Sequence, residues 1–119
     1  LAIATTTSPV NIAVLLRNAI GPDWKDLFAV IEDASTAPKK KPHPQVYAQT
    51  LARLGLHGAD CLAFEDSNTG ITSSLGAGIP TIALPDRVLL DSRRGMKILN
   101  GFAMEDFRRL KFYLLQKQF

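Results

Sequence analysis

Short apolar runs alternate along the first 84 residues with segments whose apolar positions recur at helical spacing. The runs are too short for helices and predict buried strands, at residues 1–5, 27–31, 62–65 and 79–84. The segments between them predict helices, at residues 11–19, 44–54 and 69–77. Strands and helices therefore alternate, which predicts right-handed crossovers and a Rossmann-like α/β fold with a parallel sheet covered on both faces.

The expected helix ends carry residues that commonly begin or end helices. Ser8 stands before Pro9, as expected of an N-cap followed by proline at the first helical position. Gly21 and Gly55 follow the first two helices and are expected to end them. The third helix has two candidate caps, Asp66 and Ser67.

Composition excludes several classes of protein. A chain of 119 residues holds at most one domain, and its apolar fraction of 46% is ordinary for a globular protein. No apolar run is long enough to span a membrane, and the single cysteine, Cys61, excludes a disulfide framework. No targeting pattern is visible, so we expect a cytoplasmic location, or a plastid if the source is a photosynthetic eukaryote.

The net charge of +3 is concentrated at the carboxyl end of the chain. Residues 86–119 carry eight basic groups and four acidic ones. We divide the chain into an α/β core at 1–85 and a basic, helical tail at 86–119. A basic tail is compatible with nucleic acid, but a solvated face is the favoured interpretation, so we expect neither a nucleic-acid nor a membrane partner. Residues 105–118 could form an amphipathic helix that covers a sheet edge or docks a partner.

Three polar segments follow apolar runs, at residues 5–8, 39–44 and 65–70. In an open parallel sheet, chemistry gathers at the carboxyl ends of the strands. The adjacent carboxylates Glu65 and Asp66 need a compensating partner at the end of a buried strand, and a hard cation, Mg²⁺, fits their oxygen donors. The alternative for Asp66 is a capping role at the next helix.

The other two segments suit a phosphate group. Thr5, Thr6 and Thr7 lie just before a helix N-terminus, where hydroxyls and backbone N–H groups favour an anion; the alternative is simple β propensity. Lys41 precedes a Pro-His-Pro run, which we expect to hold it on an extended backbone; the alternative is three solvated lysines. Asp33, also at a strand end, is a further substrate-side candidate.

Together these segments resemble known motifs. Residues 1–9, 41–44 and 64–70 are similar to the second, third and fourth motifs of haloacid dehalogenase-like phosphohydrolases, in the family's order. The Ala-Thr-Thr-Thr-Ser-Pro run and the Lys-Pro-x-Pro turn look like those of the CbbY-like and β-phosphoglucomutase-like branch. The resemblance covers residues 1 to about 85, and as a set of three motifs it is specific for the superfamily.

The resemblance implies Mg²⁺-assisted phosphoryl transfer from a small sugar-phosphate monoester through an aspartyl-phosphate, with hydrolysis favoured over mutase activity. It implies that Thr5 and the Thr6 backbone N–H bind the phosphoryl group. It further implies that Lys41 binds both phosphate and nucleophile as a catalytic residue, and that Asp66, with Glu65, completes the metal shell.

One departure from the family affects catalysis. The family's first motif, Asp-x-Asp on its opening strand, has no counterpart anywhere in this chain, and the cap domain that follows it is absent. The strand-like run at Leu1 suggests a segment cut from a longer protein. In the family the missing strand lies between the equivalents of 1–5 and 62–65, so both should have unpaired edges. We therefore expect a chain that is poorly soluble and inactive alone; the alternative is a non-catalytic phosphate-binding or regulatory module.

Overall fold

The structure is a computed structural model, and it describes residues 1–83 and 97–98. Within these residues the strands are β1 (Ala2–Ala4), β2 (Val30–Glu32), β3 (Ala63–Glu65), β4 (Thr81–Ala83) and β5 (Lys97–Ile98). The α-helices of the same part are α1 (Pro9–Ile20), α2 (Gln45–Leu54) and α3 (Asn68–Gly76). Two short 3₁₀ helices, η1 (Trp24–Leu27) and η2 (Gly58–Asp60), complete the order. The predicted alternation of strands and helices is confirmed.

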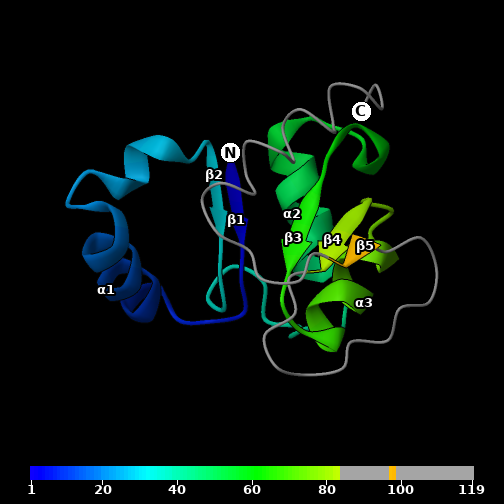
Figure 1. The fold of residues 1–119 in the computed structure, drawn as a ribbon, viewed down its shortest axis with the longest axis horizontal. Coiled ribbons are helices and arrows are strands. Elements are labelled where there is room, and N and C mark those ends of the chain that lie inside the picture. Colours follow the sequence, from blue (N-terminus) through cyan, green and yellow to red (C-terminus); the bar gives the residue numbers. More distant parts are fainter. Residues whose placement is uncertain (84–96, 99–119) are drawn as a thin grey trace.

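In the described part of the chain the strands form two separate parallel ladders. β1 pairs with β2, with Ala2 opposite Val30, and β3 pairs with β4, which pairs in turn with β5. Across the molecule the order is β2, β1, β3, β4, β5 (Figure 1). β1 and β3 are neighbours in this order but belong to different ladders, so each turns an edge toward the other. Such edges were expected from the missing strand.

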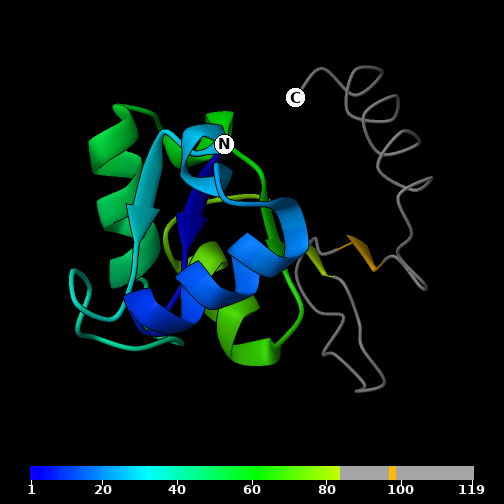
Figure 2. The ribbon, with the colours of Figure 1, turned by 90° about the vertical axis from the view of Figure 1, so that its left-hand side faces the viewer.

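The helices lie on two sides of the strands. α2 packs on β1 and β2, α3 packs on β3 and β4, and the two helices contact each other, forming one layer. α1 lies across the β1–β2 pair from α2, as the two views show (Figures 1 and 2). Within the described residues Ile12 is the one buried residue of α1, and Val10, Val14 and Leu15 are exposed.

The expected helix ends are confirmed where the structure describes them. The Ser8 hydroxyl accepts from the Asn11 N–H at the start of α1, and the Ser67 hydroxyl accepts from the Gly70 N–H at the start of α3. Gly55 ends α2 in the left-handed conformation, at φ 67°. Each cap supplies a hydrogen bond to a backbone group that has no partner inside the helix.

The core lies beneath the β1–β3 junction, where α2 meets both ladders. It is a cluster of Ala37, Val46, Tyr47, Ala63 and Ile79, with Leu51 and Cys61 packed against it. Cys61 is partly exposed rather than fully buried. The cluster places the first turn of α2 against β3, and this contact positions the polar groups described below.

Three expectations need correction or lie outside the described residues. The second strand begins at Val30 rather than Leu27, because Trp24–Leu27 forms a 3₁₀ helix with Trp24 buried. In the tail, where we expected helix, Lys97–Ile98 pairs with β4 as a strand. The rest of the predicted tail, including 105–118, lies outside the described residues. None of the helices within residues 1–83 has the length and apolarity that crossing a membrane requires.

Candidate active site

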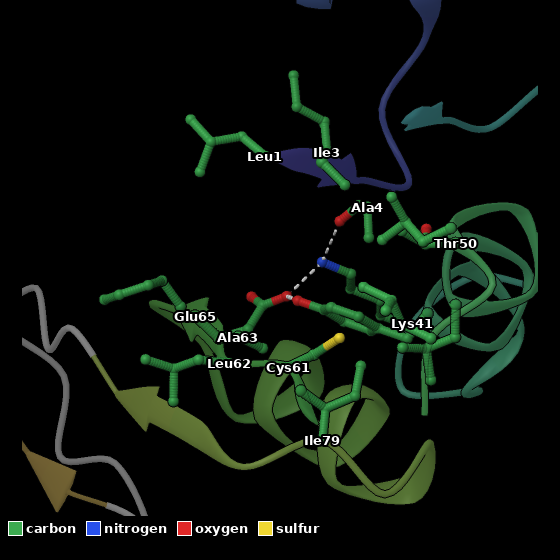
Figure 3. Close-up of a pocket in the computed structure, with 16 residues that line it drawn as sticks. Leu1, Ile3, Ala4, Lys41, Thr50, Cys61, Leu62, Ala63, Glu65 and Ile79 are labelled. Atoms are coloured by element: carbon green, nitrogen blue, oxygen red, sulfur yellow. Dashed lines mark hydrogen bonds and ion pairs between the residues drawn. The ribbon is translucent and has the colours of Figure 1, made fainter. Parts of the chain in front are cut away.

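The Lys41 ammonium links the carboxyl ends of β1 and β3. It donates to the carbonyl oxygen of Ala4, the last residue of β1, at 3.0 Å. It also donates to Oε1 of Glu65, the last residue of β3, at 2.5 Å (Figure 3). The Lys41 side chain is 14% exposed. One cation therefore brings together two strand ends that share no backbone hydrogen bonds.

Between β1 and β3 lies a cavity of about 540 Å³, which we call the slot. One wall is formed by residues 1–4, which include β1, and the other by residues 61–65, which include β3. Leu51 and Leu54 of α2 also line it. The lining also includes Lys41, Tyr47 and Glu65. The slot is therefore largely apolar, and its charged groups lie where the two strands end.

Glu65 is held on several sides. It is 8% exposed and accepts at Oε1 from the Lys41 ammonium and from the Tyr47 hydroxyl. A Cβ atom built on Gly70 would overlap the Glu65 carboxylate, with Oε2 the nearest atom. A buried carboxylate is stable only when it is paired and hydrogen-bonded, and these contacts meet that requirement.

Asp66 follows Glu65 and is exposed. Ser67, not Asp66, caps α3, so the capping alternative for Asp66 does not hold. Within residues 1–83 and 97–98 no three acidic, histidine or cysteine side chains gather as a metal-binding group. Mg²⁺ is usually held by one or two carboxylates together with water and substrate phosphate, so Glu65 and Asp66 fit this ion as a donor set.

The threonines lie beside the strand end that Lys41 contacts. Thr5 follows Ala4 directly, and its backbone N–H donates to the Glu32 carbonyl at 3.0 Å. Its hydroxyl accepts from the Thr7 N–H at 3.2 Å, which leaves the hydroxyl hydrogen available for a phosphoryl oxygen. Thr6 makes no hydrogen bond with another described residue. Both residues are half-buried, just before the α1 N-terminus.

The backbone that holds Lys41 differs from our expectation. Residues 41–44 form a turn rather than an extended segment, and the His43 N–H donates to the Lys40 carbonyl at 3.0 Å. Lys39 and Lys40 are exposed, whereas Lys41 points into the molecule. The choice of Lys41 among the three lysines is therefore consistent with the geometry.

Asp33, considered as a substrate-side candidate, serves its own turn. Its Oδ1 accepts from the Ser35 hydroxyl and from the Ser35 backbone N–H, at 2.5 and 2.8 Å. The hydrogen bond from the Ser35 side chain is the main reason that the pKa of Asp33 lies below its usual value. This carboxylate is explained by the loop that it closes.

Tyr47 was not among the candidate site residues predicted from the sequence. The hydroxyl of Tyr47 donates to Glu65, and its ring centroid lies 5.0 Å from the Lys41 ammonium. Burial, and then the charges of Glu65 and Asp66, raise the pKa of Tyr47 well above its ordinary value. The only signal in the sequence is a polar-tipped aromatic residue on the buried face of the helix that follows Lys41.

Comparisons with known proteins agree with this architecture. A family model described as haloacid dehalogenase-like hydrolase matches residues 1–78. The plasmid-encoded protein CbbY of Cupriavidus necator is 53% identical over 85 residues, which cover 71% of this chain and 34% of that protein. Hexitol phosphatase B of Escherichia coli K12 is 40% identical over 63 residues, covering 53% of this chain and 28% of that enzyme.

Among solved structures, the crystal structure of CbbY from Rhodobacter sphaeroides in complex with phosphate matches with a TM-score of 0.72 and 30% identity. The match covers 82% of this chain and 44% of that one. The chain thus spans about a third of the length of the two curated relatives named above. Because the family model spans residues 1–78 and the CbbY similarity covers most of the chain, this protein belongs to the haloacid dehalogenase-like hydrolases, in the branch that contains CbbY.

Proposed function

We propose that this chain forms the phosphate- and metal-binding part of a phosphohydrolase acting on small monoesters of the sugar-phosphate type. The observation that carries the proposal is the position of Lys41, which lines the slot and whose ammonium joins the ends of β1 and β3. A fixed cation at the ends of two parallel strands is suited to neutralise charge on a transferring phosphoryl group.

The other site residues take the roles that the family resemblance implies. The Thr5 hydroxyl and the Thr6 N–H bind phosphoryl oxygens, helped by the α1 N-terminus. Glu65 and Asp66 hold Mg²⁺, which when bound neutralises phosphate charge and orients the ester. Lys41 contacts the phosphate and the nucleophile together.

The nucleophile must come from outside the 119 residues, since the sequence contains no Asp-x-Asp motif. A strand entering the slot would pair with the facing edges of β1 and β3 and bring its carboxyl end to Lys41. An aspartate there attacks phosphorus, the ester P–O bond breaks, and a second aspartate protonates the departing alcohol. Water then cleaves the acyl phosphate, releasing inorganic phosphate and restoring the carboxylate.

The relatives support the substrate class. One is named a hexitol phosphatase, and a CbbY protein has been crystallised in complex with phosphate. The apolar slot also supports a missing strand, because buried parallel strands are mostly apolar on both faces.

The test is a chimera in which the 85 residues of this chain that match C. necator CbbY replace their counterparts in that protein, whose remaining residues are the source of the first motif and cap that the family resemblance implies. We expect Mg²⁺-dependent release of inorganic phosphate from sugar phosphates. Lys41→Met and Asp66→Ala should each lower kcat/KM by at least about a hundredfold, because each removes charge stabilisation of the transition state. Lys39→Met, at an exposed lysine, is the matched control. Full activity of Asp66→Ala would reject the site assignment.

The rival is a module that binds phosphate without catalysis. The proposed phosphate-binding residues Thr5, Thr6 and Lys41 are sufficient for such a module as long as no strand with a nucleophile enters the slot. It predicts that the 119-residue chain alone binds inorganic phosphate, as measured by ³¹P NMR, and that the chimera hydrolyses nothing. Hydrolysis by the chimera that is lost in Lys41→Met would exclude this rival.

A further inference from the structure

Tyr47 contacts both members of the ion pair at the centre of the site. Its hydroxyl donates to Oε1 of Glu65, the same oxygen that accepts from the Lys41 ammonium. Its ring centroid lies 5.0 Å from that ammonium, within the range of a cation–π contact. No other residue in the described part of the chain touches Lys41 and Glu65 in both of these ways.

Tyr47 is itself well fixed. It is the third residue of α2, it is 8% exposed, and it belongs to the core cluster with Val46, Ala63 and Ile79. A tyrosine has two main side-chain torsions, and packing of the ring restricts both. The hydroxyl is therefore presented to Glu65 from a rigid position, whereas Lys41 reaches the same oxygen at the end of a long side chain.

The Glu65 carboxylate is confined on its other side as well. Oε2 lies against Gly70, where a Cβ atom would collide with it. With Oε1 bound to two donors and Oε2 packed against a backbone, the plane of the carboxylate has little freedom to turn. The arrangement fixes which way each oxygen points.

We propose that Tyr47 is a positioning residue for the divalent cation: its hydroxyl sets the orientation of Glu65, and its ring keeps Lys41 beside that carboxylate. This inference rests on the metal site of the proposed function. Groups that hydrogen-bond to a metal ligand commonly change metal affinity or activity by about 10- to 100-fold when they are removed.

The experiment compares the 119-residue chain with its Tyr47→Phe variant, which keeps the ring and removes the hydroxyl. The probe is Mn²⁺, a paramagnetic substitute for Mg²⁺, and binding is followed by water-proton relaxation, which detects weak sites. We expect Tyr47→Phe to raise the dissociation constant about tenfold. Thr50→Val is the matched control, because it removes another buried hydroxyl of α2, one whose hydrogen bond goes to the Val46 carbonyl and not to Lys41 or Glu65.

A second measurement separates positioning from stability. A purely structural hydroxyl would lower the midpoint of thermal unfolding equally with and without Mn²⁺. A positioning role instead reduces the increase in midpoint that saturating Mn²⁺ produces, and Thr50→Val should keep that increase. If Tyr47→Phe does not fold, the same comparison is made with Tyr47→Met, which also lacks the hydroxyl and keeps an apolar side chain.

The outcomes distinguish two failures. If the unchanged chain binds Mn²⁺ and the hydroxyl-free variant binds it equally well, the role of Tyr47 is wrong while the metal site of the proposed function stands. If the unchanged chain binds no Mn²⁺, the metal site at Glu65 and Asp66 is wrong, and the role of Tyr47 is overturned with it.

Discussion

The Glu65 carboxylate occupies the space in which a side chain on residue 70 would begin. Gly70 is the third residue of α3, and its N–H is the group that Ser67 caps. Glycine is needed here for space rather than for backbone conformation. Gly70, which in the sequence belongs to a polar turn-like segment, thus leaves space for the buried carboxylate of Glu65 in the candidate site.

Gly70→Ala should destabilise the chain by displacing Glu65. The added Cβ must push the carboxylate away from Lys41 and Tyr47, at a cost of about 1–3 kcal/mol for disrupted buried hydrogen bonds. Alanine recovers at most about 1 kcal/mol through its better helix propensity. Urea denaturation measures the net loss. Gly76→Ala on the same helix is the control, because its Cβ would meet Pro44 no closer than 3.4 Å. Equal effects of the two changes would contradict the crowding at residue 70.

Lys41→Met should lower the free energy of unfolding by about 3 kcal/mol, because it leaves the Glu65 carboxylate buried without its cation. Adding Glu65→Gln to that variant should restore much of the loss, since a neutral amide needs no counter-charge. Guanidinium denaturation of the single and double variants measures both values. Lys39→Met and Lys40→Met, at exposed positions, should change stability by less than about 0.5 kcal/mol. A loss that the double variant does not reduce would exclude the ion pair as its cause.

The parts of the fold that the sequence predicts are those set by local patterns. Serine at positions 8 and 67 and glycine at 55 end or begin helices through hydrogen bonds within a few residues, so they can be read from the chain. The contacts of Tyr47 and Gly70 with Glu65 join residues from different elements, and no local pattern encodes them. The prediction of an extended backbone at Lys41 was wrong for a related reason. Proline restricts its neighbour but does not determine how the following residues fold back.

The same distinction applies to the site. Strand-end placement led us to expect Glu65 near the end of β1, and proline adjacency favoured Lys41 among three lysines; the structure brings these two side chains together. Strand-end placement does not distinguish Asp33, which also follows a strand but closes a turn with Ser35. Position along a strand narrows the candidate residues, and the partners of each carboxylate then show what it holds together: Asp33 closes its own turn, whereas Glu65 pairs with a lysine from another segment.

The turn closed by Asp33 should make stability depend on pH in the acid range. The folded-state pKa lies below the ordinary value of 3.8, mainly because the Ser35 side chain donates to the carboxylate. Folding therefore favours the ionised Asp33 carboxylate. Its contribution to the free energy of unfolding is present above the unfolded-state pKa and is lost as pH falls through the folded-state pKa. The stability difference between the unchanged chain and Asp33→Asn should accordingly be largest above about pH 5 and shrink toward pH 2.

Urea denaturation across that pH range measures the difference. Asp26→Asn, at an exposed aspartate, is the control and should shift stability by less than about 0.5 kcal/mol. A difference for Asp33→Asn that stays constant from pH 7 to about 2 would show that the carboxylate charge does not stabilise the turn.

Cys61 offers a direct test of the slot, because it is the only cysteine in the sequence, is partly exposed and lines that cavity. A peptide that carries the apolar opening strand and Asp-x-Asp motif implied by the family resemblance should enter between β1 and β3 and cover the thiol. We expect alkylation of Cys61 by iodoacetamide to slow at least about tenfold at saturating peptide, since reaction then requires the strand to leave. A scrambled peptide of the same composition should give no protection. If both peptides leave the alkylation rate unchanged, the slot does not accept a strand, and the nucleophile of the proposed reaction must reach Lys41 by another route.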